Sequence, residues 1–181
     1  MIETQRLILR PWRDEDLEPF AALNADADVM RFFERPFTRT ESDHSVERFN
    51  SHIETNGYGL WAAELKHDAS FVGLLGIQNV GDDLLFGPTV EIGWRLRKDV
   101  WGQGLAPEGA VGALQFAFAD LKLPEVVSFT AVCNKPSRRV MEKIGMKTDA
   151  KEDFDHPRVT AGHALARHCL YRIAAKGFNP F

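Results

Sequence analysis

A short glycine-bearing segment offers the clearest binding chemistry in this sequence. Gly102 and Gly104 stand in VWGQGLA, residues 100–106, between an expected strand and an expected helix. The start of a helix leaves backbone N–H groups unpaired, and glycine lets a ligand approach the backbone without a Cβ clash. A phosphate or pyrophosphate is the group that such a loop would hold. A plain turn between a strand and a helix could use the same glycines, so this segment alone does not establish a phosphate-binding site.

Two common phosphate-binding loops do not fit this segment. A dinucleotide-binding turn needs a third glycine where Pro107 stands, and two helices are expected where a βαβ unit would begin. A P-loop needs Gly-Lys-Ser/Thr, which does not follow here. A nucleotide-dependent oxidoreductase is disfavoured because no acidic residue follows at the usual spacing on a second parallel strand.

Hydrophobic periodicity predicts the elements that position the loop. Apolar residues alternate over 90–96, which indicates a strand before it, and an apolar stripe predicts a helix over about 107–121 after it. Asp14 is expected to cap a first helix, Thr40 with Asp43 a second, and Gly57 to end the second. Further strands are expected near 7–9, 58–65, 71–80, 126–132, 147–154 and 165–173, with a short helix from Pro136 to Gly145.

The expected element order is typical of a mixed α/β fold. One strand, two helices and three strands precede the loop, and a helix, a strand, a helix and two strands follow it. This order is not a βαβ repeat. The chain has 181 residues, of which 44% are hydrophobic, which suits one domain over residues 1–181.

Composition argues against several classes of partner and compartment. A net charge of -4 argues against a nucleic-acid surface. No apolar run approaches the roughly 20 residues that cross a bilayer, and the first residues do not resemble a signal peptide. Two cysteines, Cys133 and Cys169, are too few for a disulfide framework. We therefore expect a cytoplasmic protein with no nucleic-acid or membrane partner.

Four segments carry a resemblance that covers essentially the whole chain in order. ETQRLILRPW at 3–12 resembles a first strand, EIGWRL at 91–96 a fourth strand, WGQGLA at 101–106 a pyrophosphate loop, and NKPSRRVMEKIGM at 134–146 a second cofactor motif. Together they resemble the GCN5-related N-acetyltransferase (GNAT) family, and most of all its RimJ/RimL-like branch. The resemblance implies a mixed, mostly antiparallel, twisted sheet of about seven strands flanked by about four helices.

The resemblance also implies an activity. It indicates transfer of acetyl from acetyl-CoA to a primary amine by direct attack, the amine being a protein N-terminal α-amine or part of a small molecule. A homodimer is compatible with this branch. The acceptor side would include Phe32 and Phe33, which could equally belong to the core.

The resemblance assigns the residues that would hold acetyl-CoA. Backbone N–H groups of residues 103–106 would bind the pyrophosphate, and the pantetheine arm would lie along 94–96 like an added strand. Trp101 stands where the family has Gln or Arg, which removes one side-chain contact. The expected cofactor-binding residues are Trp94, Arg95, Leu96, Trp101, Gly102, Gln103, Gly104, Leu105, Ala106, Asn134 and Ser137.

The reaction needs a base because an amine attacks only when neutral. The pKa of an α-amine is about 7.7–8.0 and that of a lysine amine about 10.4. Glu91 is the candidate, because a glutamate in this strand acts as the base in some family members. A water molecule and His156 are alternatives, and an ordinary structural glutamate is another. The spacing of His156, His163 and His168 matches no standard metal site, so no metal is expected.

The departing thiolate would gain from a proton donor. Many family members use a tyrosine, but the matching residue here is Met141, which cannot donate. RimL-like members offer a serine, matched by Ser137, which could instead only cap its helix. Asn134 would bond the pantetheine or order the helix start. The missing tyrosine keeps open a second hypothesis, an acyl-CoA-binding module without turnover.

Overall fold

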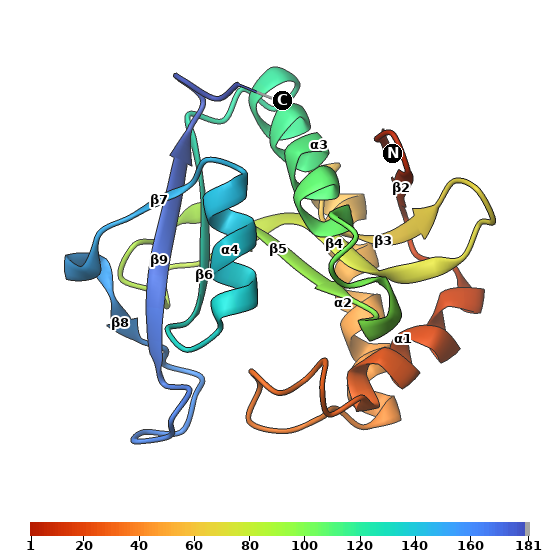
Figure 1. The fold of residues 1–181 in the computed structure, drawn as a ribbon, viewed down its shortest axis with the longest axis horizontal. Coiled ribbons are helices and arrows are strands. Elements are labelled where there is room, and N and C mark those ends of the chain that lie inside the picture. Colours follow the sequence, from red (N-terminus) through yellow and green to blue (C-terminus); the bar gives the residue numbers. More distant parts are fainter. Residues whose placement is uncertain (180–181) are drawn as a thin grey trace.

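A nine-stranded sheet runs through residues 1–179, which are the residues described by the computed structural model. Its strand order is β1-β2-β3-β4-β5-β6-β9-β7, with β8 also beside β9 (Figure 1). All of these pairs are antiparallel except β5 with β6. The strands are β1 Ile2–Glu3, β2 Leu7–Arg10, β3 Leu60–Leu65, β4 Phe71–Val80, β5 Thr89–Leu96, β6 Glu125–Ala131, β7 Lys147–Thr148, β8 Phe154–Asp155 and β9 Arg167–Ala174. The predicted mixed, mostly antiparallel sheet is confirmed.

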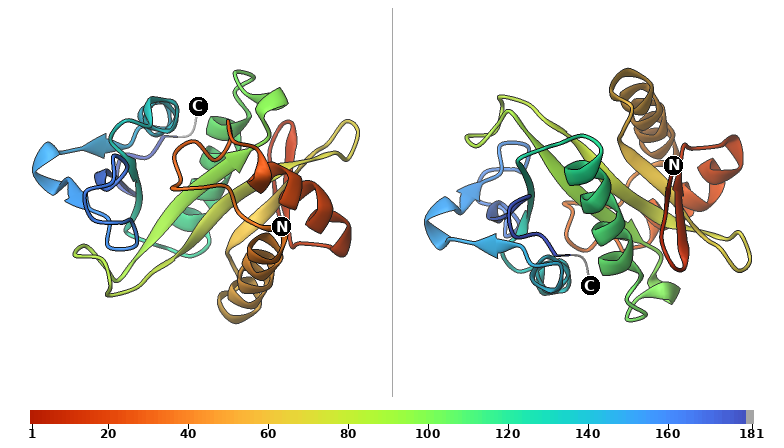
Figure 2. Two further views of the ribbon diagram at one scale, coloured as in Figure 1. Left: turned by 90° about the horizontal axis from the view of Figure 1, so that it is seen from below. Right: turned by 90° about the horizontal axis from the view of Figure 1, so that it is seen from above.

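Four α-helices among these residues cover the two faces of the sheet. They are α1 Leu17–Ala25, α2 Arg39–Asn56, α3 Leu105–Ala119 and α4 Lys135–Lys143. Figure 2 shows α1 and α2 on one face and α3 on the other. No helix within residues 1–179 is both long and apolar enough to span a bilayer. The single domain predicted over 1–181 stays a prediction, and residues 180 and 181 lie outside the described part.

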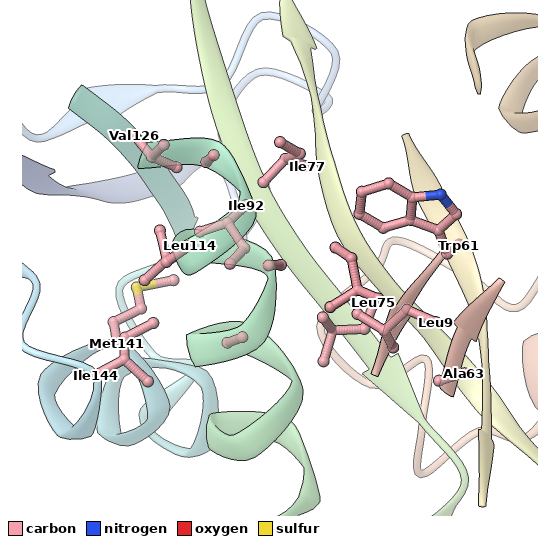
Figure 3. Packing of buried hydrophobic residues seen from close by; sticks show 14 of the residues in the cluster. Leu9, Trp61, Ala63, Leu75, Ile77, Ile92, Leu114, Val126, Met141 and Ile144 are labelled. Atoms are coloured by element: carbon pink, nitrogen blue, oxygen red, sulfur yellow. The ribbon is translucent and has the colours of Figure 1, made fainter. Parts of the chain in front are cut away.

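The larger core lies between the sheet and the helices α3 and α4. Figure 3 shows Leu75 and Ile92 of the sheet, Leu114 of α3 and Met141 of α4 pointing into this layer. Gly109 allows α3 to lie close to the sheet, because a Cβ there would be 2.6 Å from Leu75 Cδ1. Met141, which stands where many family members have a tyrosine, is therefore a buried packing residue and does not face a ligand.

The caps predicted for the first two helices are wrong by one or two residues. Thr38, not Thr40, caps α2, because Thr38 and Glu41 form a reciprocal capping box while Asp43 pairs with Arg39. The first turn Asp14–Asp16 is a 3-10 helix capped by Arg13. Its Asp16 carboxylate accepts from Arg13 N at 2.8 Å, so the predicted capping role of Asp14 belongs to Asp16.

The strand predicted over 147–154 is divided, which raises the strand count above the expected number. A 3-10 turn, Ala150–Glu152, separates β7 from β8. Asp149 Oδ1 accepts a hydrogen bond from Lys151 N at 3.0 Å, and such a local bond competes with the sheet ladder. Both short strands still pair with β9.

Candidate active site

The sheet splits between β5 and β6. These strands share one parallel bridge, Glu91 with Val127, although β5 continues to Leu96 beside β4. Ser128 Oγ donates to Ile92 O at 2.9 Å where the contact ends. Beyond this point the two strands separate, and one edge of β5 has no neighbouring strand within residues 1–179 (Figure 1).

The strand register determines which backbone groups face this split. Arg97 N donates to Val72 O at 2.8 Å, so odd-numbered residues of β5 bond to β4. The N–H and C=O groups of Ile92, Trp94 and Leu96 therefore point to the opposite edge. Ile92 O accepts from Ser128 Oγ, which agrees with this alternation. Trp94 lies in the open part of the edge, where an extended ligand arm can pair with it.

Trp101 fastens the glycine loop to the end of β5. Its indole Nε1–H donates to Leu96 O at 2.8 Å, and the Arg31 guanidinium lies 5.0 Å from its ring. The Leu96 carbonyl is thus occupied, while its N–H points into the split. The Trp101 side chain, which is predicted to bind the cofactor, thus has a hydrogen-bond partner within the chain and anchors the loop.

The loop presents a row of open amides at the start of α3. Gly102 and Gly104 have left-handed backbone, with φ of 76° and 80°, and Gly104 is the N-cap of α3. No side chain caps this helix, and within residues 1–179 no backbone N–H of residues 102–106 donates a hydrogen bond. Left-handed glycines followed by a helix start form a cradle for an oxyanion, so these residues fit a diphosphate.

Arg6, which sequence reasoning missed, holds the loop from the side. Its Nη1 donates to Gln103 O at 2.9 Å, and its Nε pairs with Glu108 Oε2 at 2.6 Å. Thr4 Oγ1 also donates to Glu108 at 2.6 Å. Burial raises the pKa of Glu108, but these hydrogen bonds outweigh it and the net pKa is lowered. The one carboxylate in the first turn of α3 is therefore neutralised by a neighbouring cation, which leaves the loop suited to an anion.

The start of α4 brings Asn134 and Ser137 together with defined roles. Asn134 is the N-cap: its Oδ1 accepts from Ser137 N at 3.3 Å, and its Nδ2 donates to Thr130 Oγ1 at 2.8 Å. Ser137 therefore does not cap the helix. Its hydroxyl makes no hydrogen bond to the part of the chain described here, so it is free to serve a ligand.

Glu91 lies on the face of β5 away from α3. Gln78, which is paired with Glu91 on the neighbouring strand β4, donates a hydrogen bond from Nε2 to Glu91 Oε1. Burial raises the pKa of Glu91 to about 7, and the Gln78 hydrogen bond offsets only part of this rise. A carboxylate with this pKa is matched to accepting a proton near neutral pH. Sequence reasoning missed Gln78, although it is the first polar residue of an apolar strand.

His156 is poorly suited to be the base. Its Nδ1 accepts from Arg158 N at 3.2 Å, and its ring lies 4.8 Å from the His168 ring. Burial, with the nearby His168 and Arg158, lowers the pKa of His156 to about 4. His163 is engaged elsewhere, with Leu165 N at 3.2 Å. Among residues 1–179, no group of three His, Cys, Asp or Glu side chains is placed to hold a metal ion.

Arg95 differs from its expected role toward the cofactor. Its backbone bonds to β4 rather than facing the split, and its side chain lies on the α1–α2 face. Its Nη1 donates to Asn24 Oδ1, and its guanidinium lies 4.3 Å from the Phe33 ring. Arg95 thus shares a face with Glu91 and not with the loop. No local sequence pattern predicts this contact, because Asn24 and Phe33 are far from Arg95 along the chain.

Comparison with known proteins agrees with this geometry. The family model described as "Acetyltransferase (GNAT) domain" matches residues 6–147, which include the split, the loop and α4. The chain belongs to the GNAT acetyltransferase family. This GNAT enzyme is an N-acetyltransferase.

Three similar proteins illustrate the relationship of this enzyme to other acetyltransferases. The enzyme is 33% identical over 152 residues to FsC-acetyl coenzyme A-N(2)-transacetylase of Aspergillus fumigatus, with 80% of this chain covering 64% of that protein. It is 26% identical over 180 residues to the uncharacterized N-acetyltransferase YnaD of Bacillus subtilis, with 98% and 99% covered. A crystal structure of a GNAT-family acetyltransferase from Bacillus anthracis matches with a TM-score of 0.80 at 25% identity, covering 97% and 98%.

The bond at the apex of the split gives a first prediction. Ser128 is buried, and its Oγ–H is the donor to Ile92 O. We expect Ser128→Ala to reduce the free energy of unfolding by about 1 kcal/mol, because one buried acceptor loses its partner. Urea denaturation measures this loss, and acetyl-CoA affinity should fall with it as the apex loosens. Unchanged values of both quantities would show that the bond does not hold the split.

Proposed function

We propose that this N-acetyltransferase uses acetyl-CoA and transfers its acetyl group to a primary amine by direct attack. One observation carries the proposal: the open amides of residues 102–106 follow directly on the strand whose free edge holds Trp94. A diphosphate in the loop and an extended arm along Trp94 would lead a thioester toward the apex of the split. The name of the Aspergillus relative, an acetyl coenzyme A transacetylase, supports this co-substrate.

The chain's own residues supply the proton transfers. When bound, acetyl-CoA supplies the thioester carbonyl. Glu91, directly or through water, takes the proton that the amine loses as the new N–C bond forms. The Ser137 hydroxyl donates to the sulfur as the C–S bond breaks, so that the thiolate leaves with a hydrogen-bond partner. Asn134 positions this hydroxyl through the helix start.

The acceptor class is the finer part of the proposal. A protein N-terminal α-amine fits the resemblance to the RimJ/RimL-like branch, and a small-molecule amine fits the N(2)-transacetylase name of the Aspergillus relative. Both acceptors require the same neutral amine at the same thioester carbon.

Thiol release with a panel of amines and N-terminal peptides tests the activity. We expect free CoA to appear faster with at least one acceptor than in the amine-free control, together with an acceptor mass gain of one acetyl group. Tight acetyl-CoA binding with no acceptor-dependent release would instead favour a binding module without turnover.

Ser137→Ala tests the proposed thiolate partner. A hydrogen bond to a charged group contributes about 1.5–3 kcal/mol, so we expect kcat to fall about 10- to 100-fold. Acetyl-CoA affinity should change little, because Asn134 still caps the helix. Ser137→Thr, which keeps a hydroxyl, is the matched control and should retain most of the activity. An alanine variant with the wild-type kcat would remove Ser137 from the mechanism.

A further inference from the structure

Arg95 is a half-buried cation that the proposed acetyl transfer does not use. Its Nε is buried and has no hydrogen-bond partner among residues 1–179. No carboxylate in this part of the chain forms an ion pair with it, whereas most other arginines here have such a partner. Burial lowers the pKa of Arg95 to about 10, so the guanidinium still carries its charge at neutral pH. Enclosing Nε without an acceptor or a counter-ion costs free energy, and the anion of a ligand would supply both.

The guanidinium is held in place rather than left loose. Ser42 Oγ accepts from Asn24 Nδ2 at 2.9 Å, which turns the amide oxygen of Asn24 toward Arg95. The rings of Phe33 and Phe37 lie 4.3 and 5.4 Å from the guanidinium carbon. Phe33 is 39% exposed, so this fixed cation lies near the surface rather than deep in the core. A planar, oriented fork of N–H donors suits a carboxylate.

The same face of β5 provides room between this cation and the proposed base. Glu91, Gly93 and Arg95 alternate on that face, and the outer two are about 13 Å apart at the usual rise per residue. A Cβ added at Gly93 would meet only Leu60 Cδ2, at 3.9 Å. The face therefore has a proton acceptor at one end, a cation at the other and, at Gly93 between them, no side chain of its own.

We propose that Arg95 binds a carboxylate of the acceptor, so that preferred acceptors are small amines that also carry a carboxylate. This inference rests on the proposed function and names the substrate class of the same site. The amine of the acceptor lies toward Glu91 and its carboxylate toward Arg95, so each charged end of a zwitterion faces a residue of opposite charge. A polycationic acceptor is disfavoured, because it would bring a second positive charge to the guanidinium.

The test compares each acceptor with its uncharged twin. A series of ω-amino acids from glycine to 6-aminohexanoate is assayed beside the corresponding carboxamides. We expect wild-type kcat/KM to favour the carboxylates by about 10- to 100-fold at the best chain length, as for a charge-assisted hydrogen bond. Arg95→Met should bring this ratio close to one, because the loss of rate falls more heavily on the carboxylates than on the carboxamides. Arg95→Lys, which keeps the charge, should keep part of the preference.

Two controls keep the outcome specific. Arg97→Met removes a nearby charge that is already paired with Asp99, and it should leave the ratio unchanged. The melting temperature of each variant shows whether it folds, and Arg95→Gln, which also removes the charge, replaces Arg95→Met if the latter does not fold. A wild-type ratio near one, or a ratio that survives in folded Arg95→Met, would overturn the inference although amine acetylation stands.

Calorimetry decides the same question without turnover. Binding of 6-aminohexanoate and its carboxamide is measured with CoA present. We expect the carboxylate to bind more tightly to the wild type and the difference to vanish in Arg95→Met. If no amine is acetylated, the proposed function fails, yet this difference still supports the Arg95 site, and equal binding of both compounds overturns it.

Discussion

We expect Glu91→Gln to lower kcat/KM by about 10²- to 10⁴-fold at pH 8, the usual contribution of a general base, and to stabilise the protein at the same pH. Glutamine keeps the size of the side chain and can still hydrogen bond to Gln78, but it cannot accept the amine proton. Acetyl-CoA affinity should not change, because Glu91 lies on the face of β5 away from the loop.

The stability effect follows from the raised pKa of Glu91. Burial lifts this pKa from 4.5 to about 7, so the folded state holds the proton more tightly than the unfolded state. That contribution to stability is fully present below pH 4.5 and is lost as the pH rises to about 7. At pH 8 the wild type therefore contains a charge that its surroundings disfavour and that the glutamine variant lacks. We expect the variant's melting temperature at pH 8 to exceed that of the wild type by at least about 2–4 °C.

The pH dependence separates Glu91 from His156. Wild-type kcat/KM should rise with pH through about 7, as the Glu91 carboxyl loses its proton. The glutamine variant should lack this rise and follow only the deprotonation of the acceptor amine. His156→Asn is the matched control and should keep the wild-type profile, because the pKa of His156 is about 4. A glutamine variant with the wild-type profile and a lower melting temperature would make Glu91 a structural residue.

Local sequence patterns predicted most of the fold. The apolar run over 71–80 has the bounds of β4, and Gly57 ends α2 in left-handed backbone, as its conformational freedom predicts. The predicted helix and strand bounds are wrong where two local sequence signals compete. Pro107 suggested the start of α3, yet Gly104 is the N-cap and the helix begins at Leu105. The turn at Ala150–Glu152 was missed because a single Asp149 side chain decides it.

The site divides in the same way. The sequence predicts that the glycine loop and Asn134 stand at helix starts, because both positions depend on local patterns, and their contact with a cofactor stays a prediction. The sequence does not predict the hydrogen bond from Trp101 to Leu96 O, since this bond depends on how the loop folds back onto β5. The family resemblance assigns residues 94–96 to the cofactor as one strand, whereas alternation sends the Arg95 side chain to the other face. Its contact with Asn24 is made between distant segments, which no local pattern reveals.

The glycine loop gives the prediction on which the rest of the mechanism depends: Gly104→Trp should abolish acetyl-CoA binding. The left-handed φ of 80° at Gly104 suits glycine, and an indole there would cover the open amides of residues 102–106. Gly104→Ala separates strain from blockage, because its Cβ would meet only Arg6 Nη2, at an ordinary 3.6 Å. We expect the alanine variant to lose about 1–2 kcal/mol of stability and to keep measurable binding.

Gly177→Trp is the matched control for the tryptophan variant. Gly177 also has left-handed backbone, with φ of 96°, and nothing lies within 4 Å of a Cβ added there. It should therefore show the strain of the substitution without loss of affinity. Calorimetric titration should show a drop of about 100-fold or more in affinity for Gly104→Trp alone, equivalent to about 2.7 kcal/mol. Folded Gly104→Trp with wild-type affinity would place the diphosphate elsewhere, and the path from the loop along Trp94 to Glu91 would lose its starting point.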